Sequence, residues 1–120
     1  MLTFVNNHNE DIWLVYMFYS PDTCGEYGDF QGIGWYHVAP GGSSTPYENS
    51  LGDVNNRYWY FYAQNWPGTF VWQGPYPLQI PANGDPFNTC QGIGSTADRQ
   101  VGLVQFDVGD YDNFTVYLNG

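Results

Sequence analysis

The chain has 120 residues, of which 20% are aromatic, with 15 glycines and 8 prolines. This length suits one domain spanning residues 1–120, and aromatics combined with turn-forming Gly and Pro are typical of an all-β fold. Twelve acidic residues, two arginines and no lysine give a formal net charge of −10. That balance argues against a nucleic-acid partner, because phosphate contacts need Lys and Arg. It leaves cations and neutral ligands open, or a role in solubility alone.

The first half of the chain alternates strand patterns with turn signals. Strands are predicted at residues 2–7, 12–19, 33–39 and 43–47, with turns or loops at 8–11, 20–32, 40–42 and 48–56. Both faces of 12–19 are apolar, so this strand should be central in its sheet. In the next strand, Ile33, Trp35 and His37 would share one face. Pro46 lacks a ladder donor, which predicts an edge position for 43–47.

The stretch "RYWYFYAQ", residues 57–64, contains five consecutive aromatics. Read with period two, Trp59, Phe61 and Ala63 would face the core between two sheets. The other face carries tyrosines, whose rings are apolar and whose hydroxyls are polar, so it could line a half-open surface. This second face is formed by Tyr58, Tyr60 and Tyr62. The strand is therefore expected to define the fold, with a ligand platform on its tyrosine face as an open alternative.

The second half of the chain predicts further short strands. A turn at 65–68 would lead to the returning arm of a hairpin at 69–74, which an extended edge segment at 75–81 follows. The region 82–100 is expected to be irregular and could hold one short helical turn. Residues 101–108 and 113–118 would form a last hairpin across the turn 109–112. Three prolines confine 75–81 to an edge. About eight or nine short strands without a convincing helix predict a single antiparallel β-sandwich or small barrel.

Cys24 and Cys90 are the two cysteines of the chain. They fit one disulfide in an oxidising compartment, with free buried thiols as the alternative. Neither has a CxxC partner, which argues against zinc. No apolar run approaches the roughly 20 residues needed to cross a bilayer, so membrane insertion is not expected. No signal peptide precedes the first strand; an extracellular or cell-surface mature form fits the cysteines and the missing lysines better than an intracellular protein.

Several motifs occur together and in a fixed order: "FVNN", "DIWLVYMFY", "GWYHVAPGG", "NRYWYFYAQ", "GPYPLQIP" and "VGLVQFDVGDYDNFTVYL". In combination the chain resembles the DUF1036 family of small, often secreted bacterial proteins, over residues 4–118. The resemblance supports pairing of Cys24 with Cys90, since many members carry cysteines at those places. Val5 and Ser43 stand where some members have further cysteines, so a second disulfide is not expected. The family's function is unknown, so the resemblance implies a secreted all-β domain and no activity.

No residue pattern places groups in catalytic roles, and we expect a non-catalytic protein. The serines lack a G-x-S-x-G elbow, and His8 and His37 are the two imidazoles. His37 lies in a strand beside Trp35 and reads as a partly buried structural histidine. His8 reads as a turn residue. No cofactor is expected, calcium excepted.

Calcium is the cofactor that the sequence leaves open. Hard oxygen ligands cluster within a seven-residue stretch at Asp107, Asp110, Asp112 and Asn113, and Ca²⁺ requires such ligands. The spacing does not match an EF-hand. An Asx-rich hairpin turn that needs no ion explains the same residues and is the preferred interpretation.

Two binding functions fit the composition. The preferred one is a carbohydrate-binding, lectin-like module that takes a neutral glycan, because sugars stack on aromatic rings and pair with amides and carboxylates. The candidate ligand-binding residues are Tyr27, Asp29, Phe30, Asn65, Trp66, Trp72, Gln73 and Tyr76. Each could instead belong to the core or to a turn. The alternative is a structural or adhesive subunit that binds its own copies, since no lysine guards its strand edges.

Overall fold

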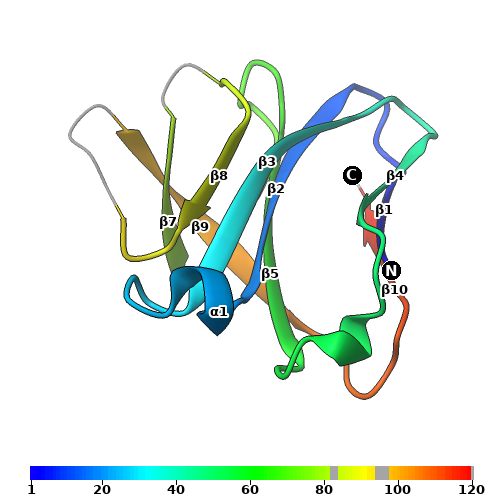
Figure 1. Ribbon diagram of the computed structural model, residues 1–120. Helices are drawn as coiled ribbons and strands as arrows, with labels where there is room; N and C mark the ends of the chain where they lie inside the picture. Colours follow the sequence, from blue (N-terminus) through cyan, green and yellow to red (C-terminus); the bar gives the residue numbers. More distant parts are fainter. Residues whose placement is uncertain (82–83, 94–97, 120) are drawn as a thin grey trace.

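The computed structural model describes residues 1–81, 84–93 and 98–119. Two β-sheets form the molecule (Figure 1), and the predicted all-β sandwich is confirmed. A seven-stranded sheet has the order β7-β9-β5-β2-β3-β8, with β6 paired to β5, and a three-stranded sheet has the order β10-β1-β4. Short helical turns, α1 (Pro21–Cys24) and the 3₁₀ turn Leu51–Asp53, interrupt the loops. No helix in the described ranges is long and apolar enough to cross a membrane.

The strand bounds agree closely with the sequence pattern in the first half of the chain. The larger sheet contains β2 (Ile12–Tyr19), β3 (Phe30–Val38), β5 (Tyr58–Asn65), β6 (Val71–Trp72), β7 (Tyr76–Pro81), β8 (Phe87–Cys90) and β9 (Asp98–Asp107). The smaller sheet contains β1 (Leu2–Asn6), β4 (Ser43–Tyr47) and β10 (Phe114–Leu118). The described residues thus form ten strands, compared with the eight or nine expected. Edge positions for β4 and β7, predicted from their prolines, are confirmed.

The central strand β2 separates two hydrophobic cores. Its residues Ile12, Leu14 and Tyr16 are buried in a first core, which lies between the two sheets and also holds Leu2, Phe4 and Leu118. Val15 and Met17 point to a second core, enclosed by strands of the larger sheet alone. A strand covered on both faces is apolar on both, which confirms the central position expected for residues 12–19.

Strand β5 confirms the predicted alternation but not the half-open face. Trp59, Phe61 and Ala63 lie in the first core. Tyr60 and Tyr62 are 7% and 4% exposed and belong to the second core. Only Tyr58, at the start of the strand, is well exposed. The platform interpretation of this strand is therefore wrong, because the larger sheet curls over the tyrosines and buries them.

A β-bulge overturns the face predicted for β3. The register with β2 shifts between Leu14 and Val15, so that Tyr36 pairs with Leu14 while Gly34 pairs with Val15. Trp35 is the extra residue, and an extra residue reverses the side-chain alternation beyond it. Ile33 consequently packs against the first core and Trp35 against the second. They do not share a face, as the period of two had suggested.

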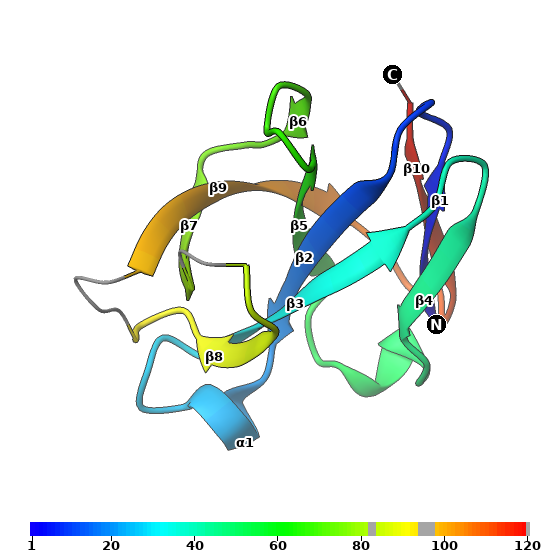
Figure 2. The same ribbon diagram turned by 90° about the horizontal axis from the view of Figure 1, so that it is seen from above.

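The curl of the larger sheet brings its two end strands together. Gln91 Nε2, just after β8, donates to the carbonyl oxygen of Pro77 in β7 at 3.2 Å. Gly32 of β3 permits this approach, because a Cβ built there would lie 2.5 Å from Leu78 Cδ2. Figure 2 shows β7, β8 and β9 on the same side of the molecule. The sheet is therefore nearly closed around the second core.

The end of the chain departs from the predicted hairpin. Strand β9 lies in the larger sheet, whereas β10 joins the smaller sheet and runs parallel to β1, with Leu2 opposite Phe114 and Asn6 opposite Leu118. Residues 101–108 and 113–118 are both strands, as expected, but they do not pair. Phe114 and Val116 pack against the first core, so β10 covers that core rather than extending β9. The expected irregular region 82–100 contains β8; its possible helical turn falls partly on residues 82–83 and 94–97, outside the described ones.

The Cys24–Cys90 disulfide is confirmed, with a Cα–Cα distance of 5.5 Å. It joins the end of α1 to the end of β8 across a separation of 66 residues. The loop that holds Cys24 is thereby tied to the edge of the larger sheet.

Candidate ligand-binding site

A surface depression of about 320 Å³ lies where two turns meet. It is lined by Asn9, Glu10, Asp11, Trp13, Pro40, Trp66 and Pro67. The antiparallel register of β2 and β5 sets Ile12 opposite Asn65, so the turn before β2 and the turn after β5 lie at the same end of the sheet. The volume is at the lower end of the roughly 300–1,000 Å³ of small-molecule sites.

Aromatic rings form one wall of this depression. Trp66 is 67% exposed, and its ring centroid lies 5.5 Å from that of the partly buried Trp13, with the planes tilted by 60°. The ring of His37 lies 5.0 Å beyond Trp13. An exposed indole that rests on a second one is held in place and still offers a flat apolar face to a ligand.

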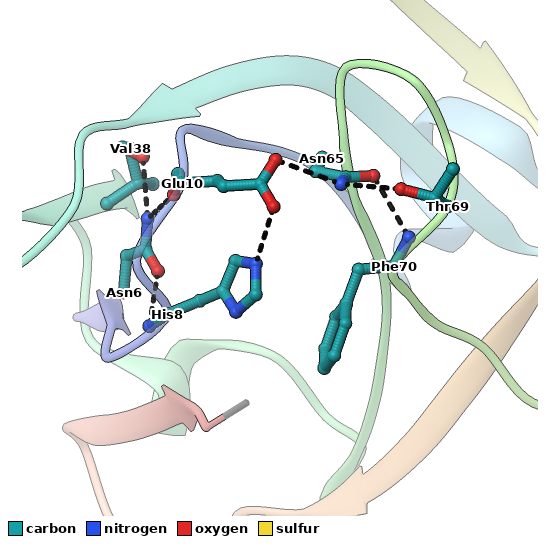
Figure 3. A network of polar contacts seen from close by, with 7 residues as sticks. All are labelled: Asn6, His8, Glu10, Val38, Asn65, Thr69 and Phe70. Atoms are coloured by element: carbon teal, nitrogen blue, oxygen red, sulfur yellow. Dashed lines mark hydrogen bonds and ion pairs between the residues drawn. The ribbon is translucent and has the colours of Figure 1, made fainter.

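The turn that carries Trp66 is fixed by Asn65 (Figure 3). Asn65 is 1% exposed. Its Oδ1 accepts a hydrogen bond from the Phe70 backbone N–H at 3.0 Å, and its Nδ2 donates to Glu10 Oε2 at 3.1 Å and to Thr69 Oγ1 at 3.0 Å. Gly68, with φ +74°, allows the chain to reverse there. Asn65 therefore positions the turn, and its amide has no exposed face toward a ligand.

A buried histidine lies behind Glu10. The side chain of His8 is 8% exposed, and its Nε2 lies 3.5 Å from Glu10 Oε1. Its ring stacks on Phe70 at 4.4 Å and meets Trp72 edge-on at 5.9 Å, and Figure 3 shows the Phe70 ring beside the imidazole. Neither ring nitrogen has a hydrogen-bond partner among the described residues. The expected turn residue is thus a buried element of the site's support.

Asn6 anchors the turn before β2, which carries Glu10. Its Nδ2 donates to the backbone carbonyls of Glu10 at 2.8 Å and Val38 at 3.0 Å, and its Oδ1 accepts from the His8 N–H at 2.8 Å. Asn6 is fully buried. Because these bonds satisfy the backbone of the turn before β2, the position of Glu10 is set by the fold.

Two carboxylates line the depression from the same turn. Asp11 Oδ1 accepts a hydrogen bond from His37 Nε2 at 2.8 Å, and Glu10 accepts from Asn65. Both carboxylate side chains are 51% exposed. Each keeps acceptor capacity toward solvent, since an ionised carboxylate offers about four lone-pair sites. The depression therefore combines an apolar aromatic face with hydrogen-bond acceptors at its rim.

The eight residues predicted to bind a ligand divide among different parts of the fold. Trp66 lines the depression, while Asn65 and Trp72 support it from inside. Phe30 and Tyr76 both contact Tyr60 of the second core, at 5.6 and 4.9 Å. The three others are outside the depression: exposed Tyr27 and partly buried Asp29 in the disulfide loop, and exposed Gln73 after β6.

In the acidic turn near the end of the chain, three of the four candidate calcium ligands bind partners within the protein. Asp107 Oδ1 accepts from Arg57 Nε at 2.7 Å and from the Gly109 N–H at 2.8 Å. The guanidinium of Arg57 and that N–H hold the pKa of Asp107 below its usual value. Asp112 accepts from Ser50 at 2.6 Å, and Asn113 from the Met1 amino group at 2.9 Å. Within the described residues, no group of three or more His, Cys, Asp or Glu side chains could hold a metal. Calcium binding by these residues, with Asp110 as the fourth ligand, is still a prediction. A calcium titration tests it.

A second depression is larger but chemically different. It measures about 370 Å³ and is lined by Leu51, Gly52, Asp53, Val54, Asn55, Asn56, Arg57, Gly109 and Asp110. No aromatic ring lines it, and its one guanidinium already pairs with Asp107. The depression beside Trp66 is therefore the better candidate for an organic ligand.

Most residues of this site were not predicted from the sequence. Trp13 reads as one more apolar residue of a central strand, and "NED" before it reads as a turn. Only the pairing of β2 with β5 brings them to Trp66. The signal that could have found the site lies in the turns "HNED" and "NWPG", which adjoin the two most aromatic strands and carry polar or aromatic side chains.

Comparisons of the chain with protein-family models, with curated proteins and with solved structures found no match. The resemblance to the DUF1036 family therefore stays a prediction from the sequence. The function has to be argued from the chemistry of the site.

Proposed function

We propose that the protein is a non-catalytic, extracellular carbohydrate-binding module whose site is the depression between Trp13 and Trp66. One observation carries the proposal: an indole that is 67% exposed lies against a second indole, beside an amide and two half-exposed carboxylates. A pyranose ring has an apolar C–H face and hydroxyls at its edge. The aromatic wall matches the first, and Asn9, Glu10 and Asp11 match the second.

The surroundings of the site support a binding role. The hydrogen bonds of Asn65 and Asn6 hold both turns, so little conformational entropy is lost when a ligand binds. The Cys24–Cys90 disulfide is consistent with an oxidising, extracellular environment. The absence of lysine and the net charge of −10 favour ligands without phosphate or other anionic groups.

A glycan array followed by titration of the bound sugars tests the proposal. Tryptophan fluorescence is the direct readout, because a sugar stacked on Trp66 changes the environment of both indoles. We expect binding by the native protein and a loss of about five- to tenfold in affinity for Trp66→Ala, since stacking on an aromatic ring contributes about 1–1.5 kcal/mol. Trp66→Phe keeps a ring and should retain part of the affinity.

The matched control is Tyr111→Ala, because Tyr111 is 71% exposed and does not line the depression. This variant should bind as the native protein does. An array without any bound glycan, together with unchanged fluorescence on adding sugars, would overturn the proposal.

The alternative is a structural or adhesive subunit that associates with its own copies. One observation favours it: β10 ends the order of the smaller sheet and pairs only with β1 in the described part of the chain. Its Tyr117 is 59% exposed. A free edge can accept a strand from another molecule. Size measurement with and without calcium tests this function, and a monomer under both conditions would contradict it.

A further inference from the structure

The depression beside Trp66 has an excess of negative charge. Glu10 and Asp11 line it, and both side chains are half exposed. Arg57 is held by Asp107 through Nε. Arg99 donates to Gln64 Oε1 at 2.6 Å and to the Tyr62 hydroxyl at 3.0 Å. The chain has no lysine, and both arginines bind other side chains. No arginine or lysine therefore neutralises these two carboxylates.

The polar groups of the depression are mostly acceptors. His37 donates one hydrogen bond to Asp11, and Asn65 donates one to Glu10. Behind Glu10, Nε2 of the buried His8 lies 3.5 Å from Glu10 Oε1. Asn9 contributes the one side-chain amide of the lining. A matching ligand is therefore rich in donors, and an ammonium group is the extreme case, with three donors and no acceptor.

The aromatic wall favours the same kind of ligand. The negative face of an indole attracts a cation, and Trp does so more strongly than Tyr or Phe. Trp13 and Trp66 are tilted by 60° with centroids 5.5 Å apart, and Trp66 is 67% exposed. The exposed Trp66 and the partly buried Trp13 do not enclose a small quaternary amine. They offer a platform for a ring that carries its ammonium group at the edge, near the carboxylates.

We infer that the site takes an amino sugar with a free, protonated amino group, that is, a de-N-acetylated hexosamine glycan, in preference to neutral sugars. This inference rests on the proposed function, and it adds the charge of the ligand. The sugar ring stacks on Trp66, and its ammonium group donates to Glu10 and Asp11. Acetylation would remove the charge and replace a donor group by a bulkier amide.

The experiment compares three tetrasaccharides of similar length: fully de-N-acetylated chitosan, fully acetylated chitin and neutral cellulose oligomers. Binding is measured by tryptophan fluorescence and calorimetry at one pH of about 7, where a large share of the amine is protonated and carboxylates are ionised. We expect the de-N-acetylated tetramer to bind about tenfold more tightly than the other two. Raising the salt from about 0.05 M to about 0.5 M should reduce this preference, because exposed charges are screened.

Charge-removing variants separate the site from the acidic surface as a whole. Glu10→Gln with Asp11→Asn should abolish the preference while neutral sugars still bind. Asp53→Asn with Asp110→Asn removes the same charge from the other depression and should leave the preference unchanged. Asp11→Asn alone serves as the milder variant if the double substitution impairs folding, because the side chains of Asp11 and of its partner His37 are both half exposed; circular dichroism establishes that each variant is folded.

The outcomes distinguish this inference from the proposed function. Equal or tighter binding of acetylated or neutral tetramers overturns the inference and leaves the carbohydrate-binding function standing. Binding of none of the three, with an empty glycan array, overturns both. If the Asp53/Asp110 double variant reduces the preference as much as the Glu10/Asp11 double variant does, the preference reflects a general attraction of polycations to the acidic surface. That result overturns the inference as well.

Discussion

The side-chain amide of Asn65 donates to Glu10 Oε2 at 3.1 Å. This contact joins the turn that carries Trp66 to the turn that carries Glu10 and Asp11. The aromatic wall and the acidic rim of the depression belong to segments far apart in the chain, and the bond holds them together from the buried side.

Replacement of Asn65 by Ala should therefore weaken both the fold and the site. Three hydrogen bonds are lost, at roughly 1 kcal/mol each, so urea unfolding should show a decrease of about 2–3 kcal/mol in the free energy of unfolding. Sugar affinity should fall as well, although Asn65 is 1% exposed. Asn55→Ala, at an exposed position, is the control; an Asn65→Ala protein as stable as the native one would contradict the assigned role.

Reduction of the Cys24–Cys90 disulfide should destabilise the protein strongly. A link across 66 residues removes loop entropy from the unfolded chain, worth about 4 kcal/mol in the chain-entropy model. Urea unfolding with and without a reductant measures the effect, and the double variant Cys24→Ser/Cys90→Ser should match the reduced protein and be insensitive to the reductant. A native protein with the same unfolding midpoint under both conditions would show that the bridge contributes nothing.

A methyl group at Gly32 should disturb the closure of the larger sheet. A Cβ there would lie 2.5 Å from Leu78 Cδ2 in the second core, and overpacking of this kind costs about 1–3 kcal/mol. The Leu78→Ala background supplies the control, because it removes the clashing atoms. Gly32→Ala should cost clearly less in that background, and equal costs in both would mean that β3 and β7 do not meet as described.

Stability should decline at alkaline pH because of Tyr16. Burial, and after it the neighbouring Tyr36, raises the pKa of the Tyr16 phenol above its ordinary value. In the unfolded chain this phenol has a pKa of about 10. Above that pH the unfolded state loses the proton while the folded state keeps it, so the free energy of unfolding falls as pH rises. The contribution of this group is fully present below about pH 10.

Unfolding by urea at a series of pH values from about 8 to 12 measures this slope. Tyr16→Phe should make it shallower, because one group that titrates differently in the two states is gone. Burial also raises the pKa of Tyr47 and of Tyr62, so part of the slope should stay. Tyr111→Phe, at a position that is 71% exposed, should leave the slope unchanged. An unaltered slope for Tyr16→Phe would contradict the prediction.

The sequence predicted those elements whose pattern reports directly on burial. Residues 12–19 are apolar on both faces, and β2 does lie between two cores. Trp59, Phe61 and Ala63 alternate with the tyrosines, and they do face the core between the sheets. The failures involve partners: β10 joins β1 instead of β9, and Trp35 is displaced to the other face by a bulge. Such a bulge leaves no trace in a period-two pattern.

Local chemistry thus determined that the chain forms short strands, that the strand at residues 12–19 is covered on both faces, and that two cysteines are available to pair. The tertiary structure decided which side chains meet. Trp13 and Trp66 lie together because β2 and β5 run antiparallel, and Tyr60 and Tyr62 are buried because the sheet curls over them. Strand pairing and sheet curvature depend on the packing of the whole domain, so no short segment encodes them.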